Sequence, residues 1–524
     1  MGASRRVCCT RWAIGLSILA ACLRGFAQVT VAGGSLLPSD HCALGFVASP
    51  DLVQRQPAAI PQAGGATHTA AEELVWRDRA LGKDDGESSD ELKRLERADW
   101  ARIQGNAKRF AEHGEPAITA LDDDKPRAVH GTLVRDAAFA YLLTKDEALL
   151  TAVRANLLAQ TKNPFNDFTG LCVRPLNGVV LDAWFFEAGW LLRHAVAYDY
   201  VRKAMPAEER LVVENWLRRS AYALAGQLDW GLAQVFPNRA QDDYSKRLGA
   251  AAAQGDARWT ARRFDSNNDC LIDDKDDPRV FQVVAYGKAN GDAGPRLSLI
   301  SQYYNNRRSA SAAAIGVIGV MLGDVPLVNR ARRYFTEWLT FSVLPDGSQG
   351  EFARNGNYCI PGQGLIYGAT NSQAMVLVAW ALARQGDRSL FDYSTRDGLF
   401  GSECAAGDST KSLSLVASTL LKLRTGDLSW FYFEPWREQQ QPRPETRLGE
   451  TRSRYKGEGN EVENFHELGT WLAEPYLNLP ALRTSLVDRV RRNAVAASTG
   501  KVVTGLGTLT DTLNALPAVV LIRP

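Results

Sequence analysis

Amide, guanidinium and phenol side chains gather between residues 303 and 367, where apolar helical runs begin or end. They are Asn305, Asn306, Arg307, Arg308, Arg354, Tyr358 and Tyr367. Amides and guanidiniums bind carboxylates, and a phenol can exchange a proton with a bound substrate. The competing interpretation is structural, because asparagine and arginine at a helix start often serve as a cap and a solvated charge.

The elements that must position these side chains are helices. From about residue 90 onward, apolar residues recur at three- and four-residue spacing, whereas the alternation typical of a half-buried strand is scarce. A long series of helices joined by short polar turns predicts an all-α domain. We expect antiparallel helical hairpins closed into an α/α toroid, an incomplete barrel. An open superhelix is the alternative, but no fixed-period repeat supports it.

Local signals predict where helices begin and where they pack closely. Thr144 and Glu147 form a capping-box pattern, and Pro206 is expected in the first turn of a later helix. Small residues at three- and four-residue spacing predict a close helix contact; they are Ala312, Gly316, Gly319 and Gly323.

The N-terminus has the pattern of a secretory signal over residues 1–27. A basic start and a short apolar run precede Gly25 and Ala27, which predict cleavage after Ala27. The sequence around Cys22 also resembles a lipobox, which would leave a lipid on that cysteine. We favour a periplasmic or secreted soluble product. No later run is apolar and long enough for a membrane helix.

The remaining chain divides by composition. Residues 28–71 are rich in Gly, Ala, Pro and Ser and predict an extended arm or linker. Residues 72–524 are expected to form the toroid domain, with a loop-rich insertion at about 239–295.

Composition limits the classes of partner and site. A formal net charge of +2, with 45% hydrophobic and 23% charged residues, is typical of a soluble globular protein and argues against nucleic acid as a partner. The sequence contains no CxxC pair and no Cys/His cluster that would suggest a zinc site. The pairing of the cysteines beyond the signal stays open; they are Cys42, Cys172, Cys270, Cys359 and Cys404.

An acidic stretch in the insertion, DSNNDCLIDDKD, partly matches a calcium-binding loop. Cys270 stands where glycine normally makes the turn, and the last position has aspartate instead of glutamate. A structural Ca²⁺ site and an acidic surface turn are both open interpretations. The six expected ligands are Asp265, Asn267, Asp269, Leu271, Asp273 and Asp276.

Four segments, in this order, resemble the alginate lyase family of polysaccharide lyases: LDAWFFEAGWLLRHAVAYDYV, YYNNRRSASAAAIGV, LPDGSQGEFARNGNY and LIYGATNSQAMVLVAWALA. The resemblance extends roughly from residue 90 to residue 424. It implies an α/α toroid, export, and cleavage of an acidic polysaccharide by β-elimination without a cofactor for catalysis.

The family pattern is Asn-Asn-His at a helix start, then Asp-Gly followed by Glu-x-x-Arg, then a tyrosine before the next helix. The resemblance carries these positions over to Asn305, Asn306, Asp346, Gly347, Glu351, Arg354 and Tyr367. Two departures stand out. Arg307 occupies the histidine position, and the segment from 355 to 364 is longer than usual, which makes Tyr358 a rival of Tyr367.

β-Elimination removes the C5 proton of a uronate and expels the oxygen at C4. Charge develops on the carboxylate, so Asn306, helped by Arg354 and Asn305, is expected to stabilise it. One tyrosine can act as base and acid if nearby cations favour its phenolate. Arg307 cannot be the base, because a guanidinium does not deprotonate in proteins. The other candidates for a base are histidines expected to be packed or capping: His130, His194 and His466.

The helix that contains LDAWFFEAGW offers aromatic side chains to a sugar. Trp184 is expected to stack on substrate, whereas Phe185 and Trp190 are expected in the core. Arg308 and Tyr358 are further substrate-binding candidates. Arg193 is expected to pair with Asp199, and a substrate carboxylate is the alternative partner.

Two other functions stay open. A glycoside hydrolase needs two carboxylates flanking the bond, and none of the available ones forms a convincing pair. These are Asp182, Glu187, Asp199 and Glu351. A catalytically silent glycan-binding protein is the third interpretation, because the family histidine is replaced.

Overall fold

The residues that the computed structural model describes are mostly helical, which confirms the all-α prediction for this part of the chain. The described residues are 65–83, 90–119, 130–166, 175–176, 179–180, 185–235, 259–263, 281–285, 304–343, 347, 349, 363–395, 410–425, 473 and 475–479.

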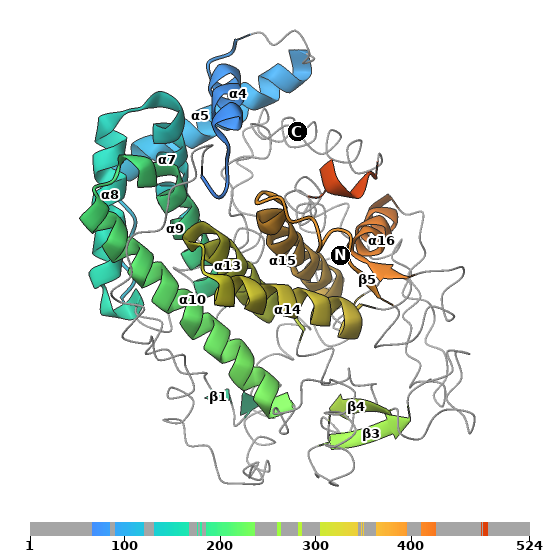
Figure 1. The fold of residues 1–524 in the computed structure, drawn as a ribbon. Coiled ribbons are helices and arrows are strands. Elements are labelled where there is room, and N and C mark those ends of the chain that lie inside the picture. The colour runs from blue at the N-terminus through green and yellow to red at the C-terminus, as the bar shows by residue number, and fades with distance from the viewer. Residues whose placement is uncertain are drawn as a thin grey trace, which may run out of the picture.

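Helices of the first half pack against one another, with α7 in contact with α4, α5, α8 and α9 (Figure 1). On α5, Ile103, Ala107 and Phe110 are buried at the spacing predicted from the sequence, and α5 packs on α7. The elements of this half are α4 (Ala70–Ala80), α5 (Asp90–His113), α7 (Thr132–Thr144), α8 (Glu147–Lys162), the 3₁₀ turn η2 (Pro164–Asn166), β1 (Pro175–Leu176), β2 (Val179–Val180), α9 (Phe185–Val201), the 3₁₀ turn η4 (Arg202–Ala204) and α10 (Ala207–Val235).

The second half adds four helices and short strand pairs among the described residues. β3 and β4 pair antiparallel within the expected insertion, and β5 pairs with β6. The elements are β3 (Trp259–Arg263), β4 (Phe281–Ala285), α13 (Asn306–Leu322), α14 (Val325–Phe341), α15 (Gln363–Ala383), β5 (Ser394–Thr395), β6 (Lys411–Ser412) and α16 (Leu413–Thr425).

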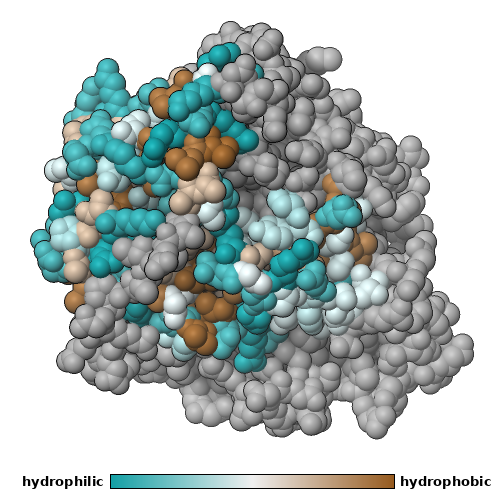
Figure 2. Space-filling view, turned by 45° about the horizontal axis from the view of Figure 1, so that its top comes forward, coloured by the Kyte–Doolittle hydropathy of each residue, from teal (hydrophilic) through white to brown (hydrophobic). Residues whose placement is uncertain are grey.

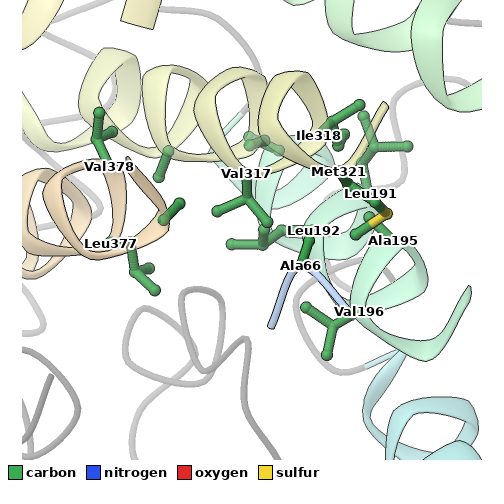
Figure 3. Packing of buried hydrophobic residues seen from close by; sticks show 14 of the residues in the cluster. Ala66, Leu191, Leu192, Ala195, Val196, Val317, Ile318, Met321, Leu377 and Val378 are labelled. Carbon is green, nitrogen blue, oxygen red and sulfur yellow. The ribbon is translucent and has the colours of Figure 1, made fainter. Parts of the chain in front are cut away.

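Helix α13 lies at the centre of the described helices and packs against α9, α10, α14 and α15 (Figure 1). Its side chains from Arg308 to Gly319 are buried on every face, as expected of a helix enclosed by others. Figure 3 shows apolar side chains of α9, α13 and α15 gathered in this core. The polar side chains among these buried residues are therefore enclosed by the neighbouring helices.

Glycines let α14 approach α13 closely. A Cβ at Gly316 would lie 3.1 Å from Ala331 Cβ, and one at Gly319 would lie 2.9 Å from the backbone nitrogen of Val328. Gly323 ends α13 with a φ of 61°. The close contact predicted from the small residues is confirmed.

Helix starts differ from the sequence prediction in two places. The N-cap of α8 is Asp146, which accepts from Ala148 N at 2.9 Å, so the capping box predicted at Thr144 is wrong. Thr144 instead ends α7 and donates to the Ala140 carbonyl. Pro206 lies one residue before α10 and accepts the first helical hydrogen bond from Arg210.

A buried turn precedes α4 near the end of the expected arm. The backbone nitrogens of Ala66 and Thr67 donate to Asp199 at 3.0 and 2.8 Å. Thr69 and Glu72 then form a capping box at the start of α4. Residues 65–69 are therefore held against α9, and α4 follows directly at residue 70.

Polar and apolar residues are interspersed over the described surface on the face shown in Figure 2. The exposed large apolar side chains are spread over more than one helix; they are Leu74, Val75, Leu81, Val212 and Val325. Within the described ranges, no helix combines the length and apolar character needed to cross a membrane.

Candidate functional site

The Asn-Asn pair begins α13. Asn305 has extended backbone angles, and its Oδ1 accepts from the backbone nitrogens of Arg307 and Arg308 at 3.1 Å each. Asn305 is 6% exposed and Asn306 is 1% exposed. Asn305 is therefore an N-cap, as the structural interpretation predicted, and it fixes where the next three side chains lie.

Arg307 has a different environment from the other charged residues around α13. Its side chain is partly exposed, and its guanidinium makes no hydrogen bond or ion pair with any residue that the structure describes. It stands in the first turn of α13, where the helix dipole is positive. The guanidinium and the helix end both favour an anion arriving from solvent.

The register of α13 and α15 places Tyr367 near this turn. Ser309 contacts Asn371, and a Cβ at Gly316 would contact Val378; both pairs are 62 positions apart in the chain, so the two helices run parallel. With the same offset, Tyr367 lies level with Asn305. Tyr367 also precedes Asn371 by one helical turn and shares its face of α15. It is partly exposed and packs on the core.

A buried polar network lies beneath the start of α13. The Ser309 hydroxyl donates to Asn371 Oδ1 and lies 3.1 Å from the Tyr334 hydroxyl. Asn371 Nδ2 donates to the Tyr304 carbonyl at 2.8 Å, and the Tyr304 hydroxyl donates to Glu337 at 2.9 Å. The sequence analysis missed this network. Its only sequence signal was polar residues inside apolar helical runs, which does not identify their partners.

The chain after α14 makes a tight turn tied to α15. Val343 and Gln349 form an antiparallel bridge, and Gly347 between them has a φ of 79°. A Cβ at Gly347 would lie 2.3 Å from Thr419 Oγ1. Gln349 Nε2 donates to Ser372 Oγ at 2.6 Å. The turn expected at the Asp-Gly pair is present at its glycine, next to the α15 face that carries Asn371.

Several predicted site residues lie outside the described residues, and their positions stay predictions. They are Asp182, Trp184, Asp265, Asn267, Asp269, Leu271, Asp273, Asp276, Asp346, Glu351, Arg354, Tyr358 and His466.

His194 is a packed residue, as expected. Its ring is fully buried, lies 4.0 Å from the Trp190 ring between ring centroids, and its Nδ1 is 2.9 Å from the Trp190 carbonyl. Burial, with a smaller effect of Arg193 and His130, lowers the pKa of His194 to about 3. His194 is therefore neutral at pH 7 and too weak and enclosed a base for a bound sugar. Trp190 is 1% exposed, which confirms it as core.

Asp199 contacts Arg202 at 3.1 Å, so the predicted pairing with Arg193 is wrong. Arg193 instead donates to the His130 carbonyl at 2.7 Å. Burial alone would raise the pKa of Asp199, but His68 and Arg202 hold it well below its usual range. With Glu187 also buried, neither carboxylate is placed for a hydrolase.

Comparisons with known proteins give no further assignment: no protein-family model matches the chain, and no curated protein matches it. Within the described ranges, no group of three or more His, Cys, Asp or Glu side chains is arranged to hold a metal ion.

Proposed function

We propose that the protein is a polysaccharide lyase that cleaves a uronic-acid polymer, alginate or a related polyuronate, by β-elimination. The observation that carries the proposal is Arg307, a partly exposed guanidinium without a partner in the described chain, at the positive end of α13. A cation, amides and a phenol around one helix start suit a substrate that is both an anion and a carbon acid.

The steps follow from that arrangement. The phenolate of Tyr367 takes the C5 proton, the electron pair forms a C4=C5 double bond, and the C4–O bond breaks. The phenol then returns the proton to the leaving oxygen. Arg307 and Arg354 bind the carboxylate and stabilise the charge that develops on it. Asn306, which is only 1% exposed at the same helix start, adds its amide dipole from within the protein. An ordinary tyrosine has a pKa near ~10, so these cations also favour the phenolate.

The remaining parts of the proposal concern fold, compartment and binding. The described helices belong to an α/α toroid whose groove binds the polysaccharide. The chain is exported, and residues 1–27 are removed as a signal peptide. Asn305, Arg308, Trp184 and Tyr358 contact the substrate. The acidic loop at 265–276 binds a structural Ca²⁺.

One assay tests the reaction class. The purified protein is incubated separately with polymannuronate, polyguluronate, polyglucuronate and a neutral glycan. A lyase produces the ultraviolet absorbance of a conjugated, unsaturated uronate from at least one acidic polymer and none from the neutral glycan. New reducing ends without that absorbance would indicate a glycoside hydrolase. Binding without either product would indicate a glycan-binding protein and would contradict the proposal.

A further inference from the structure

Asn371 joins the two helices that carry the proposed site. Its side chain is 0% exposed, and both ends of its amide are used. Nδ2 donates to the carbonyl of Tyr304, directly before the N-cap, and Oδ1 accepts from Ser309, in the first turn of α13. These two contacts lie on either side of Asn305 and Asn306 in the chain.

Helix α14 contacts the same hydrogen-bond network. The Ser309 hydroxyl also lies 3.1 Å from the Tyr334 hydroxyl on α14. Ser309 and Tyr334 are both 0% exposed, so water cannot replace a lost contact. Leaving one such buried group unsatisfied is unfavourable, because the group has lost its contact with water and gains none in return. The network therefore permits little sliding of α15 along α13.

The position of Asn371 relates it to the reacting groups. Tyr367 lies one turn before it on the same face of α15, and the amide contacts the chain just before Asn305 and just after Arg308. Asn371 itself is enclosed and cannot reach a substrate. It can act only by setting where Tyr367 lies relative to the start of α13.

We propose that Asn371 is a positioning residue for the elimination, fixing the register between the tyrosine helix and the Asn-Asn helix start. This inference rests on the proposed lyase activity. A displacement of about 1 Å in a reacting group can cost about 100-fold in rate, so a polar contact away from the chemistry can have a large kinetic effect.

Asn371→Asp tests the role with almost no change of shape. A carboxylate still accepts from Ser309 but cannot donate to the Tyr304 carbonyl. We expect kcat to fall about 100-fold while KM changes less than about threefold, because ground-state binding is largely kept. Ser309→Ala keeps the bond from Asn371 to Tyr304 and should lower kcat about tenfold, so it carries the test if the aspartate variant does not fold.

Asn166→Asp is the matched control. Asn166 is also 0% exposed, and its Nδ2 donates to Gln160 at 2.7 Å, away from α13. It should lose stability but keep its kcat. Amide hydrogen exchange at Arg307 and Arg308 adds a readout without substrate: it should accelerate in Asn371→Asp and not in the control.

The two possible failures are distinguishable. If the wild type forms unsaturated product and Asn371→Asp keeps its kcat, the positioning role is overturned. If the wild type forms no unsaturated product, the proposed function is overturned instead. In that case unchanged exchange at Arg307 and Arg308 would also overturn the structural part of the inference.

Discussion

The two ends of helix α13 differ in how their charges are partnered. At the C-terminal end, Arg202 contacts Asp199 at 3.1 Å and donates to the Met321 carbonyl at 3.1 Å. Asp324, next to that end, lies 3.3 Å from Arg218. All four charged side chains are at most 3% exposed. These charges are enclosed and neutralised within the protein.

At the N-terminal end two features differ from this arrangement. Below the first turn, Ser309, Tyr334 and Asn371 form a buried network of uncharged side chains. In the turn itself, Arg307 is partly exposed and makes no ion pair with any described residue. This end has a rigid support and one cation that faces solvent.

This difference predicts which substitutions change stability and which change turnover. Removing one partner of an enclosed ion pair leaves a buried charge and destabilises the fold. Removing a partly exposed cation without a partner takes away little that holds the protein together. Substitutions at the C-terminal end should therefore change the free energy of unfolding, and substitutions at the N-terminal end should change turnover.

The largest expected effect is at the N-terminal end. Tyr367→Phe removes the proposed base and acid and should lower kcat by at least about a thousand-fold, with substrate binding largely kept. Tyr141→Phe, a buried tyrosine on α7, is the control and should keep its kcat. Loss of turnover in Tyr358→Phe instead would show that the alignment across residues 355–364 is wrong.

A substitution at the C-terminal end of α13 should change the free energy of unfolding. Asp324→Asn removes the charge beside Arg218 and weakens the acceptor for the Tyr222 hydroxyl, now at 2.8 Å. We expect the free energy of unfolding to fall by about 3 kcal/mol. Chemical denaturation measures it, and kcat of the folded protein should stay unchanged. A lower kcat with an unchanged free energy of unfolding would contradict the structural role given to the C-terminal end of α13.

Arg307→Ala should lower activity and leave stability almost unchanged. Loss of a charged hydrogen bond to the substrate carboxylate should lower kcat/KM about 30-fold, equivalent to about 2 kcal/mol, and leave the unfolding free energy within about 0.5 kcal/mol. Lys203→Ala removes the same charge from an exposed site at the other end and should leave both quantities unchanged. Full activity of Arg307→Ala would remove this residue from the mechanism.

The smallest effect concerns His194, which has lost its charge to burial. Its pKa is about 3 when folded and near 6.5 when unfolded, so the unfolded chain binds a proton first as the pH falls. The stability that comes from keeping His194 neutral is almost complete at pH 7.5 and should decrease by about 1.4 kcal/mol between pH 7.5 and pH 5.5. His194→Gln should remove that part of the pH dependence. An identical pH dependence in both proteins would contradict the assignment.

The sequence predicted helices and their packing faces better than polar partners. Apolar spacing identified the buried face of α5, and Gly316 and Gly319 indicated a close helix contact without identifying its partner, because both signals are local. The partners of Asp199 could not be predicted. Ala66 lies 133 positions away from it in the chain, and Arg193 and Arg202 both fall within a few residues of it.

In the candidate site, too, local features could be predicted from the sequence and contacts between helices could not. The cap at Asn305 follows from a local pattern, so the sequence could predict it. The bonds of Asn371 depend on the register of two helices 62 positions apart, which helical periodicity does not specify. Arg307 was identified as unusual by type, but its lack of a partner among the described residues is a property of packing.

The most direct test of the account is the absorbance assay with paired variants. Wild-type protein, Tyr367→Phe and Tyr141→Phe are incubated with the acidic polymer that the wild type cleaves best among polymannuronate, polyguluronate and polyglucuronate. The account predicts unsaturated product from the wild type and from Tyr141→Phe, and none above background from Tyr367→Phe. Wild-type cleavage that yields reducing ends without ultraviolet absorbance, or no cleavage of any of the three polymers, would contradict it.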